Sequence, residues 1–576
     1  MPDSAGSVLI VGAGPSGLTL AGELARRGIG CRLIEQREAR QDRSKAITLH
    51  ARTLEIFEDL GIIGEVLALG APAGAISVWH STSRSARAAG APHRLVQMTM
   101  GALPAPHPIQ LNLHQHETER LLEARAARYG VGLERGVRFI GLDQDQDGVR
   151  VHLRHLANDR IETARFDWVV GCDGVNSSVR EALGLSFEGT RYPESYLLAD
   201  VRIDWGLSHD DAQLLLSPYG TLMGMPLAGG LWRIVADFNL DKDGGREPEP
   251  TVAALQQLLE RRGANGAVLR ELDWFSIFRL ERRLVDRFRV GRVFVLGDAA
   301  HVHSAVLNQG MNTGIGDAYN LGWKLALVAG GTGQPALLDS FQDERMPIAR
   351  LVLRNSHAAT RMIGIRGRAA DMARAWTLRV VTKSEAVRRF VQASGGQLSF
   401  RYTRSHLVTE DGAKAGRHGP QPGERAPYTV YGPAGARHRS IDAIQGGGHV
   451  LLLFASIADP DRYRRLGRIA AEVQTRCPGY LAAHVVVPQE AQPAGLAEPL
   501  SVLLDPDRML HRVFGARTEC LYLIRPDGYI AYRSAPADAT GLGAYLDRVF
   551  LPGVGREPAG DSIADPGGVQ PRVREQ

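Results

Sequence analysis

Lysine is scarce in this chain. Of its 68 basic residues, five are lysines and the rest are arginines. They are dispersed along the sequence, and no run of them resembles a nucleic-acid-binding arm or a membrane-binding patch. The net charge of +5 therefore indicates a mildly basic, solvated surface, and we expect neither nucleic acid nor a membrane as a partner.

Cysteine is also rare, and long apolar runs are missing. The four cysteines, Cys31, Cys172, Cys477 and Cys520, are far apart and form neither a CxxC pair nor a metal-ligand spacing. This usage is typical of free thiols in a reducing compartment, so we expect a cytoplasmic protein with no metal site. No stretch approaches the roughly 18 apolar residues of a membrane span. The apolar run at residues 8–11 is too short for a secretion signal.

The length and the local patterns predict an α/β protein of several domains. A chain of 576 residues exceeds what one hydrophobic core usually organises. Strand, loop, helix and strand patterns follow one another over residues 7–35. Short strands joined by Gly, Asp and Pro turns over 195–280 predict an inserted antiparallel sheet. Residues 44–61 and 336–400 have helical patterns, and the Gly- and Pro-rich stretch 401–430 is typical of a linker.

The first motif with a chemical meaning is the glycine-rich loop Gly-Ala-Gly-Pro-Ser-Gly at residues 12–17. Gly12 permits a tight turn, Gly14 lets the backbone approach a pyrophosphate, and Gly17 lets the next helix pack on the strand. The amides at the helix start then face the phosphates. Glu35, at the end of the second strand, can bind both hydroxyls of a ribose, and a solvated surface acid is the alternative. Its carboxylate would repel a 2′-phosphate, so the loop suits FAD or NAD better than NADP.

Two later segments follow this loop in a recognisable order. They are GCDGVNSSVR at 171–180 and GDAAHVHSAVLNQGMNTGIGDAYNLGWK at 297–324. Together with the loop at 12–17, they resemble the fingerprints of class A FAD-dependent aromatic hydroxylases, a family of flavoprotein monooxygenases. The resemblance implies a Rossmann-like FAD-binding domain. No motif for covalent flavin attachment is present, so we expect FAD to be bound non-covalently.

The resemblance gives the late segment a role at the flavin. Asp298 would hydrogen-bond the ribityl chain of FAD. The amides of Met311 and Asn312, on a helix that begins near Gly310, would face the pyrimidine edge of the flavin. Such a helix start stabilises the negative charge that reduced flavin carries near N1. His301 and His303, in the same segment, suggest acid–base chemistry, but packing and hydrogen bonding near the flavin are the better interpretation.

Other positions match the family pattern singly. Arg43 and Gln115 match positions that contact the FAD phosphates and the flavin surroundings, with surface polar residues as the alternative. Asp173 matches the family's DG motif, and an ordinary turn residue is its alternative. The complete expected FAD site is Gly12, Gly14, Pro15, Ser16, Gly17, Glu35, Gln36, Arg37, Arg43, Ser44, Gln115, Asp173, Gly297, Asp298, Gly310, Met311 and Asn312.

The chain departs from the family at two places. His114 stands where relatives usually have proline, and Ala305-Val306-Leu307-Asn308 replaces a P-x-G-G segment that should lie near the flavin C4a edge. The second departure puts the family's pocket shape in doubt for this chain. Residues expected at the substrate pocket are Met223, Met225, Pro226, Arg233, Leu307 and Asn308, although methionine and proline in a sheet are more often plain core.

The resemblance also implies a reaction. FAD would take electrons from NAD(P)H and react with O2 to form a C4a-hydroperoxide, which hydroxylates a phenolic or polycyclic aromatic substrate. No second dinucleotide loop follows a strand, so NAD(P)H would bind transiently. The alternative is a flavin oxidoreductase of another type, through Baeyer–Villiger-like oxygenation or dehydrogenation, and a non-catalytic flavin-binding protein is the third interpretation. The sequence identifies no catalytic base, and a homodimer stays open.

These patterns predict a division into domains. The FAD-binding domain would comprise residues 1–190 and 281–345, with the substrate-binding sheet over 191–280 and a helical segment over 346–400. Residues 401–552 resemble the thioredoxin-like domain of many aromatic hydroxylases but lack the CxxC pair, so we expect no disulfide chemistry there. Removal of this region should spare the flavin chemistry and harm stability. Residues 553–576 should form a mobile tail.

Overall fold

The computed structural model describes residues 8–43, 46–80, 92–100, 103–238, 251–304, 307–364, 368–411, 418–457, 459–493, 496 and 500–553. Ser44, Ala305, Val306 and the tail beyond Gly553 lie outside these ranges. The FAD contact predicted for Ser44 and the tail predicted over 553–576 therefore stay predictions.

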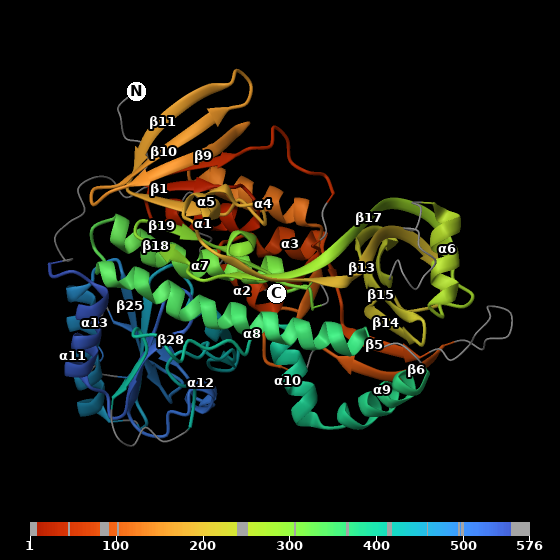
Figure 1. Cartoon of the computed structure of the whole chain (residues 1–576). Coiled ribbons are helices and arrows are strands. Elements are labelled where there is room, and N and C mark those ends of the chain that lie inside the picture. Colours follow the sequence, from red (N-terminus) through yellow and green to blue (C-terminus); the bar gives the residue numbers. More distant parts are fainter. Residues whose placement is uncertain are drawn as a thin grey trace.

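A mostly parallel six-stranded sheet carries the first part of the fold (Figure 1). In spatial order its strands are β18 (Arg289–Val290), β19 (Val293–Val295), β12 (Trp168–Gly171), β1 (Val8–Val11), β2 (Cys31–Glu35) and β8 (Leu133–Arg135). The three central strands β19, β12 and β1 are buried throughout, as expected where both faces of a parallel sheet are covered. Helix α1 (Pro15–Ala25) packs between α4 (Gln115–Arg128) and α7 (Gly310–Ala329). The order of elements predicted for residues 7–35 is confirmed.

An eight-stranded sheet lies beside the first one. Its spatial order is β20 (His301–Val302), β17 (Val268–Val285), β13 (Phe187–Asp204), β16 (Trp232–Phe238), β15 (Gly220–Pro226), β14 (Asp211–Ser217), β5 (Ala75–His80) and β6 (His93–Thr99). Neighbours are antiparallel except β14 and β5, which are parallel. The sheet thus extends beyond the predicted bounds 191–280 and is not purely antiparallel, because β5 and β6 join it from an earlier part of the chain. Helix α6 (Val252–Arg261) covers its outer face, where Leu255 and Leu259 join the apolar core.

Smaller elements complete this part of the molecule. The antiparallel sheet β9 (Val137–Gln144), β10 (Val149–His155) and β11 (Arg160–Phe166) projects at the top of Figure 1. A helix predicted over 44–61 is partly wrong, because β3 (Thr48–His50) precedes α2 (Ala51–Asp59). β3 is fully buried and pairs with β7 (Gln110–Asn112), which also pairs with β4 (Ala71–Pro72). Two further helices are α3 (Ile63–Leu69) and α5 (Ser178–Ala182).

Helices connect the two sheets to the C-terminal part. The helical prediction over 336–400 is confirmed by α8 (Asp339–Ile363), α9 (Arg368–Val381) and α10 (Glu385–Gly395). Figure 1 shows α8 crossing the molecule from the C-terminal part toward β5, with α9 and α10 below it. In the part of the chain that the structure describes, no helix combines the length and the apolar character that a membrane crossing requires.

The C-terminal part contains a third large sheet. Its order is β21 (Thr409–Asp411), β28 (Ile530–Ser534), β27 (Cys520–Ile524), β24 (His449–Phe454), β25 (Leu481–Val487) and β26 (Ser501–Leu504). Helices α11 (Pro460–Arg476), α12 (Met509–Val513) and α13 (Ala539–Val549) accompany it, with a short pair β22 (Val430–Tyr431) and β23 (His438–Arg439). Its likeness to thioredoxin stays a prediction.

The linker predicted over 401–430 is wrong for the residues of this stretch that the structure describes. Tyr402 and Leu407 are buried, and β21 pairs with β28 in parallel. Glycine, proline and arginine in this stretch reflect tight turns rather than a loose connection. Gly423, for example, has a φ of +84° and lies against the backbone of Tyr402.

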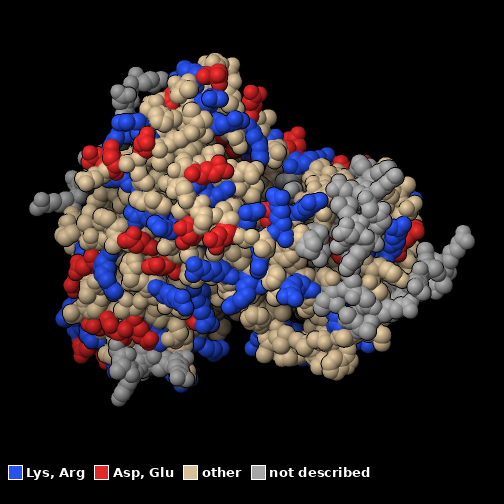
Figure 2. Space-filling model, viewed as in Figure 1, with Lys and Arg blue, Asp and Glu red and all other residues tan. Residues whose placement is uncertain are grey.

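The surface carries both charge signs in alternation. Figure 2 shows Lys and Arg side chains interspersed with Asp and Glu over most of the face in view. Many of these charges form exposed ion pairs, such as Arg270 with Asp204 and Arg476 with Asp547. The face shown fits the dispersed, solvated charge that the sequence predicts.

Candidate functional site

The first two glycine motifs meet at the carboxyl ends of β1 and β12. A Cβ at Gly17 would fall 1.9 Å from the carbonyl oxygen of Gly12, and a Cβ at Gly12 would fall 2.5 Å from the carbonyl oxygen of Cys172. Gly12 also has a φ of +103°, which side chains rarely adopt. Gly12 and Gly17 therefore cannot carry side chains, because Gly12 lies against the backbone of Cys172 and Gly17 against that of Gly12.

The third motif joins the same place. Added Cβ atoms at Gly297 and Gly314 would lie 2.7 and 2.4 Å from Ser16 Oγ, at the start of α1. Arg180, in the second motif, donates a hydrogen bond to the carbonyl of Ala299, in the third, at 3.1 Å. Segments far apart in the sequence thus converge at the carboxyl edge of neighbouring parallel strands, which is where open α/β sheets bind ligands.

Two helices start at this point without a side-chain cap among the described residues. α1 has Gly14 at its N-cap and α7 has Gln309, and neither shows a capping hydrogen bond. Among the described residues, apart from chain neighbours and the helix's own backbone, no atom lies within 4 Å of the place where a Cβ of Gly14 or Gly310 would stand, so both helix starts face open space. Unbonded amides and the positive end of the helix dipole attract anions. This arrangement fits a dinucleotide whose pyrophosphate lies at one helix start and whose anionic ring lies at the other.

Glu35 is fixed beside the first loop. Its Oε2 accepts a hydrogen bond from the amide of Ala13 and its Oε1 accepts one from the amide of Arg37, both at 3.0 Å. The carboxylate is half-buried at the end of β2, whereas Gln36 and Arg37 are exposed. This placement suits the predicted ribose contact and argues against the alternative of a freely solvated acid.

The two motif aspartates differ in their surroundings. Asp173 accepts hydrogen bonds from Ser177 Oγ at 2.5 Å and from the amide of Val179 at 3.2 Å, so it helps to cap α5. Burial raises the pKa of its carboxyl, and these hydrogen bonds oppose that shift. Asp298 is exposed just after Gly297. The described bonds of Asp173 match its alternative interpretation as a turn residue, and its predicted FAD contact stays a prediction.

Arg43 and Gln115 are bonded to other partners. Arg43 is exposed and pairs with Asp273 of β17. Gln115 begins α4 and donates to Glu119 Oε1 at 2.8 Å. Burial is the main cause that raises the pKa of Glu119. Contacts of Arg43 with a phosphate would require it to leave Asp273, so this role stays a prediction.

A buried carboxylate in α7, which the sequence interpretation missed, organises the third motif. Asp317 accepts from the amide of Gly297 at 3.2 Å, from His301 Nε2 at 2.6 Å and from Arg345 Nε at 2.6 Å. Burial would raise the pKa of Asp317, but Arg345 and His301 bring it to about 2. The signal in the sequence is a polar residue within an otherwise apolar helical run.

The motif histidines are packed rather than poised for proton transfer. The rings of His301 and His303 stack with their centroids 4.7 Å apart. Burial, together with the neighbouring His301, lowers the pKa of His303 to about 3. His303 is therefore neutral at ordinary pH, and the packing interpretation of this pair is the better one.

The start of α7 is tied to β3 and α2. Asn312 Oδ1 accepts from the amide of His50 at 2.8 Å and from Thr53 Oγ1 at 2.7 Å. Its Nδ2 donates to the carbonyls of Thr48 at 2.8 Å and Asn308 at 3.0 Å. Asn308 has a φ of +51°, a conformation that asparagine tolerates better than most side chains. This explains how asparagine replaces the glycine that relatives often have there.

The inner face of the eight-stranded sheet meets this segment. Met225, Arg233, Asp200 and Trp274 stand opposite one another on β15, β16, β13 and β17. Met225 Sδ lies 3.2 Å from Asn308 Nδ2. Of the residues predicted at the substrate pocket, Met225 and Asn308 are therefore brought together. Met223 packs in the same apolar cluster as Met225.

The other predicted pocket residues are less open. Arg233 is fully buried, and its Nε and Nη2 bond both carboxylate oxygens of Asp200 at 2.6 and 2.7 Å. His114, the departure beside Gln115, lies with its Nδ1 3.9 Å from Asp200 Oδ2. Pro226 is buried and its carbonyl accepts from Asn112 at 3.0 Å, whereas Leu307 is half-buried. Arg233 thus supports the sheet from within.

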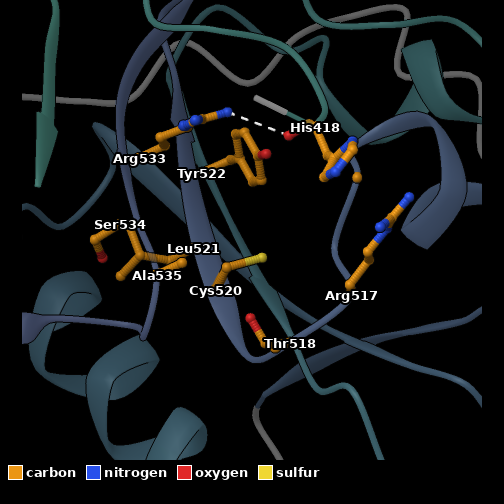
Figure 3. Close-up of a pocket in the computed structure, with 10 residues that line it drawn as sticks. His418, Arg517, Thr518, Cys520, Leu521, Tyr522, Arg533, Ser534 and Ala535 are labelled. Carbon is orange, nitrogen blue, oxygen red and sulfur yellow. Dashed lines mark hydrogen bonds between the residues drawn. The ribbon is translucent and has the colours of Figure 1, made fainter. Parts of the chain in front are cut away.

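A cavity of about 220 Å³ lies in the C-terminal sheet and contains none of the glycine motifs. Figure 3 shows Cys520 between Arg517 and Leu521 at its wall, with Arg533 bonded to the carbonyl of His418. Burial raises the pKa of Cys520 to about 12. The thiol is therefore protonated, which agrees with the absence of a CxxC pair and with free cysteines throughout.

The chain is similar in sequence to known proteins over most of its length. The model of the family described as FAD binding domain matches residues 6–356. The 6-methylpretetramide 4-monooxygenase of Streptomyces rimosus is 35% identical over 97% of this chain and 96% of its own length. The pentachlorophenol 4-monooxygenase of Sphingobium chlorophenolicum is 32% identical over 92% of this chain and 94% of its own length.

A solved structure agrees in fold. The ternary complex of aklavinone-11 hydroxylase with FAD and aklavinone has a TM-score of 0.73 and 24% identity, and the match covers 95% of this chain and 99% of that one. This likeness shows the fold alone. The family model and the two nearly full-length relatives decide the family: the chain belongs to the class A FAD-dependent aromatic hydroxylases and is a flavoprotein monooxygenase that binds FAD.

Proposed function

We propose that this enzyme hydroxylates a phenolic or polycyclic aromatic compound with NAD(P)H and O2. The observation that supports this most is the position of the uncapped start of α7. It lies beside Asn308, which contacts Met225 of the eight-stranded sheet, and α7 also contacts the uncapped start of α1 at Ser16. Two relatives are named for oxygenation of 6-methylpretetramide and pentachlorophenol, which favours phenolic rings. A cytoplasmic location, expected from the cysteine usage, is part of the same proposal.

The residues would divide the work as follows. Gly14 and the amides at the start of α1 would hold the pyrophosphate, and Glu35 would hold the ribose. The amides of Gly310, Met311 and Asn312 would face the flavin pyrimidine edge. Bound FAD would supply the redox chemistry, accepting hydride from transiently bound NAD(P)H and activating O2 at its C4a carbon.

The sheet side would select the substrate. Met223 and Met225 offer polarizable, adaptable side chains that suit flat aromatic rings, and Leu307 with Asn308 would border the ring from the flavin side. Water must be kept from the reacting oxygen, and the apolar cluster of Ile47, Met225 and Leu227 serves this purpose.

The test is a panel of phenols and polycyclic phenols incubated with enzyme, NADH or NADPH, and 18O2. We expect NAD(P)H oxidation coupled to a product that gains one 18O atom, measured by mass spectrometry. Oxidation with peroxide but no labelled product across the panel would contradict aromatic hydroxylation and favour the alternative flavin oxidoreductase. Insertion of 18O into a ring ketone would identify Baeyer–Villiger-like oxygenation.

A further inference from the structure

The tight turn between β27 and β28 contacts the helix that begins at the flavin site. This turn comprises residues 525–528, and the amide of Gly528 bonds the carbonyl of Arg525 at 2.8 Å. Tyr319 Oη of α7 donates to Asp59 Oδ2 of α2 at 2.6 Å and also lies 3.2 Å from the carbonyl oxygen of Pro526. Asn320 of α7 donates to Asp527 Oδ2 at 3.0 Å. The C-terminal part therefore contacts α7 directly, about two and a half turns after its start.

Buried charges reinforce this contact. The guanidinium of Arg525 bonds both oxygens of Glu344 at 2.6 and 2.8 Å and Asp527 Oδ1 at 2.9 Å. Lys324 of α7 bonds Glu344 at 2.7 Å. The side chains of Lys324, Glu344 and Arg525 are fully shielded from solvent. Separation of such charges is strongly unfavourable, so the turn cannot move away from α7 and α8 without breaking the whole cluster.

The same turn also holds α2. Arg52, in the first turn of α2, donates to the carbonyl of Asp527. Its guanidinium lies 5.3 Å above the ring centroid of Tyr529, which follows the turn. Nearby, Arg425 bonds Glu55 of α2 at 2.7 Å. α2 and α7 are thus fixed to one element of the C-terminal part.

These two helices meet at their starts. His50, the N-cap of α2, contacts the carbonyl of Asn308 through Nε2 at 3.2 Å and bonds Asn312 through its amide. Burial lowers the pKa of His50 to about 4, so its ring is neutral and keeps this contact without a charge. A displacement of either helix would therefore be transmitted to residues 308–312.

We propose that the 525–528 turn is a clamp that fixes residues 308–312 through α2 and α7, and so sets the position of the flavin edge where oxygen reacts. The turn residues act through the helices and are positioning residues. The proposal rests on the proposed placement of the flavin at the start of α7. It gives the C-terminal part a role in the flavin chemistry that needs no redox cysteine, in contrast to the expectation that its removal spares this chemistry.

The test compares variants of the full chain. In Arg52→Lys/Tyr319→Phe, one contact of each helix with the turn is lost while charge and ring are kept. Tyr319→Phe also removes the bond to Asp59 of α2, so Arg52→Lys alone is measured beside the double variant. An effect that appears only with Tyr319→Phe would point to the Asp59 bond and overturn the clamp.

Tyr545→Phe is the matched control, because its hydroxyl donates to the carbonyl of Leu407 at 3.1 Å within the C-terminal part. Hydrogen–deuterium exchange of peptides covering 308–316 is measured without and with FAD, beside the FAD dissociation constant and the peroxide released per NAD(P)H.

We expect exchange at 308–316 to be at least tenfold faster in the double variant than in the control, with FAD affinity several-fold lower and more peroxide. Exchange equal to that of the control would overturn the clamp. Faster exchange with unchanged FAD affinity would overturn its link to the cofactor. If the double variant does not fold, Arg52→Lys alone is compared with the control in the same way. Failure to hydroxylate any aromatic compound, with the exchange and affinity effects present, would contradict the proposed substrate class and leave the clamp standing.

Discussion

The first amides of the helices have different partners in the C-terminal part and in the FAD-binding part. In the C-terminal part, an aspartate bonds the first amides of each of the helices α11, α12 and α13. Asp459 and Asp538 are the N-caps of α11 and α13 and accept from the amide of Asp461 and from those of Thr540 and Gly541. Asp505 precedes the N-cap of α12 by three residues and accepts from the amides of Met509 and His511. In the FAD-binding part, α1 and α7 follow Gly14 and Gln309 and have no such cap among the described residues. In the C-terminal part, a carboxylate of the protein accepts hydrogen bonds from the amides at the helix starts. At the starts of α1 and α7, we expect an anionic ligand to take this place.

This contrast distinguishes helices whose first amides bond an aspartate of the protein from α1 and α7, whose starts are expected to bind a ligand. Both kinds follow strands of an α/β sheet, so topology alone does not distinguish them. A helix start is stabilised by negative charge in either case. Among the described helices, α2, α3 and α4 also lack a side-chain cap. A missing cap therefore suggests a ligand only where the helix start also faces open space, as at Gly14 and Gly310.

The largest effect on FAD binding is expected when α1 is given a capping side chain. Gly14 has a φ of −75° and open space around its missing side chain, so Gly14→Asp should fold. The new carboxylate would cap the helix and repel the pyrophosphate, at a cost to FAD binding of about 3 kcal/mol or more. Titration of FAD fluorescence measures this loss, with Gly14→Asn as the neutral capping control. A dissociation constant equal to that of Gly14→Asn would mean that no phosphate lies there.

Removal of the acids expected at FAD should have the next largest effect. Glu35→Ala removes the acceptor of two loop amides and of the ribose, and Asp298→Ala removes the expected acceptor at the ribityl chain. Each loss should weaken FAD binding by about 1.5–3 kcal/mol, the range for hydrogen bonds to charged groups. Isothermal titration of the FAD-free chains gives the values. Affinities equal to wild type in both variants would contradict the placement of the cofactor.

Acid should destabilise both regions through buried histidines. Burial lowers the pKa of His50 to about 4 and that of His449 to about 3, whereas the unfolded chain has the ordinary value of 6.5. As the pH falls below 6.5, the unfolded chain takes up protons that the folded chain does not. Stability is therefore lost progressively from pH 6.5 down to the folded pKa values, by about 2 kcal/mol per histidine between pH 7 and pH 5.

Denaturant unfolding at pH 7 and pH 5 measures this loss. His449→Phe, in the C-terminal sheet, should remove its share of the pH dependence while the aromatic contacts with Trp323 and Phe550 keep a ring in place. The same pH dependence in the variant and in the wild type would show that His449 is protonated in the folded chain.

Loss of a C-terminal cap should have a smaller and purely structural effect. Asp538→Ala leaves the amides of Thr540 and Gly541 at the start of α13 without their acceptor. The free energy of unfolding should fall by about 1 kcal/mol, measured by denaturant titration, with FAD affinity unchanged. Weaker FAD binding in this variant would show that the two regions are not distinct in the way described.

Substitutions at Leu307 and Asn308, where the chain departs from the family pattern, should hardly change cofactor binding. In Leu307→Gly/Asn308→Gly, glycine suits the left-handed conformation of residue 308, so FAD affinity should stay nearly the same. The space beside the presumed reactive carbon should increase and alter the substrate range or raise the wasted peroxide. Product profiles and NAD(P)H-to-product ratios are measured side by side with wild type. Identical values would mean that these residues face away from the site.

Much of the fold around the glycine motifs could be predicted from the sequence. Gly12 and Gly17 lie too close to neighbouring backbone for a side chain, and Gly297 has a φ of +59° and lies against the side chain of Ser16. The strand, loop and helix order at the N-terminus followed from short apolar runs. β3 was missed because Thr48, Leu49 and His50 continue a helical pattern, and only pairing with β7 makes them a strand.

The polar interior was harder to predict. Asp317, Arg345 and the cluster around Arg525 are charged residues that look solvated in a sequence, and their partners are distant along the chain. The ion pair of Arg233 was not predicted either, because its partner Asp200 lies on another strand, and its place at the substrate pocket stays a prediction. Pairing of buried charges depends on the assembled fold, and no local pattern records it.

The long strands β13 and β17 have a practical consequence. They pair over nearly their whole length, and Gly189 lies so close to Arg282 that a Cβ there would meet its carbonyl oxygen at 1.8 Å. The chain thus passes from the FAD-binding part into the eight-stranded sheet along β13 and returns along β17, and these two strands are paired with each other. β5 and β6 reach the same sheet from an earlier part of the chain. Chimeras that exchange the residues between 191 and 281 together with those two strands would move the eight-stranded sheet except β20 and the outer ends of β13 and β17. Exchange of this unit between relatives would show whether the sheet determines substrate specificity.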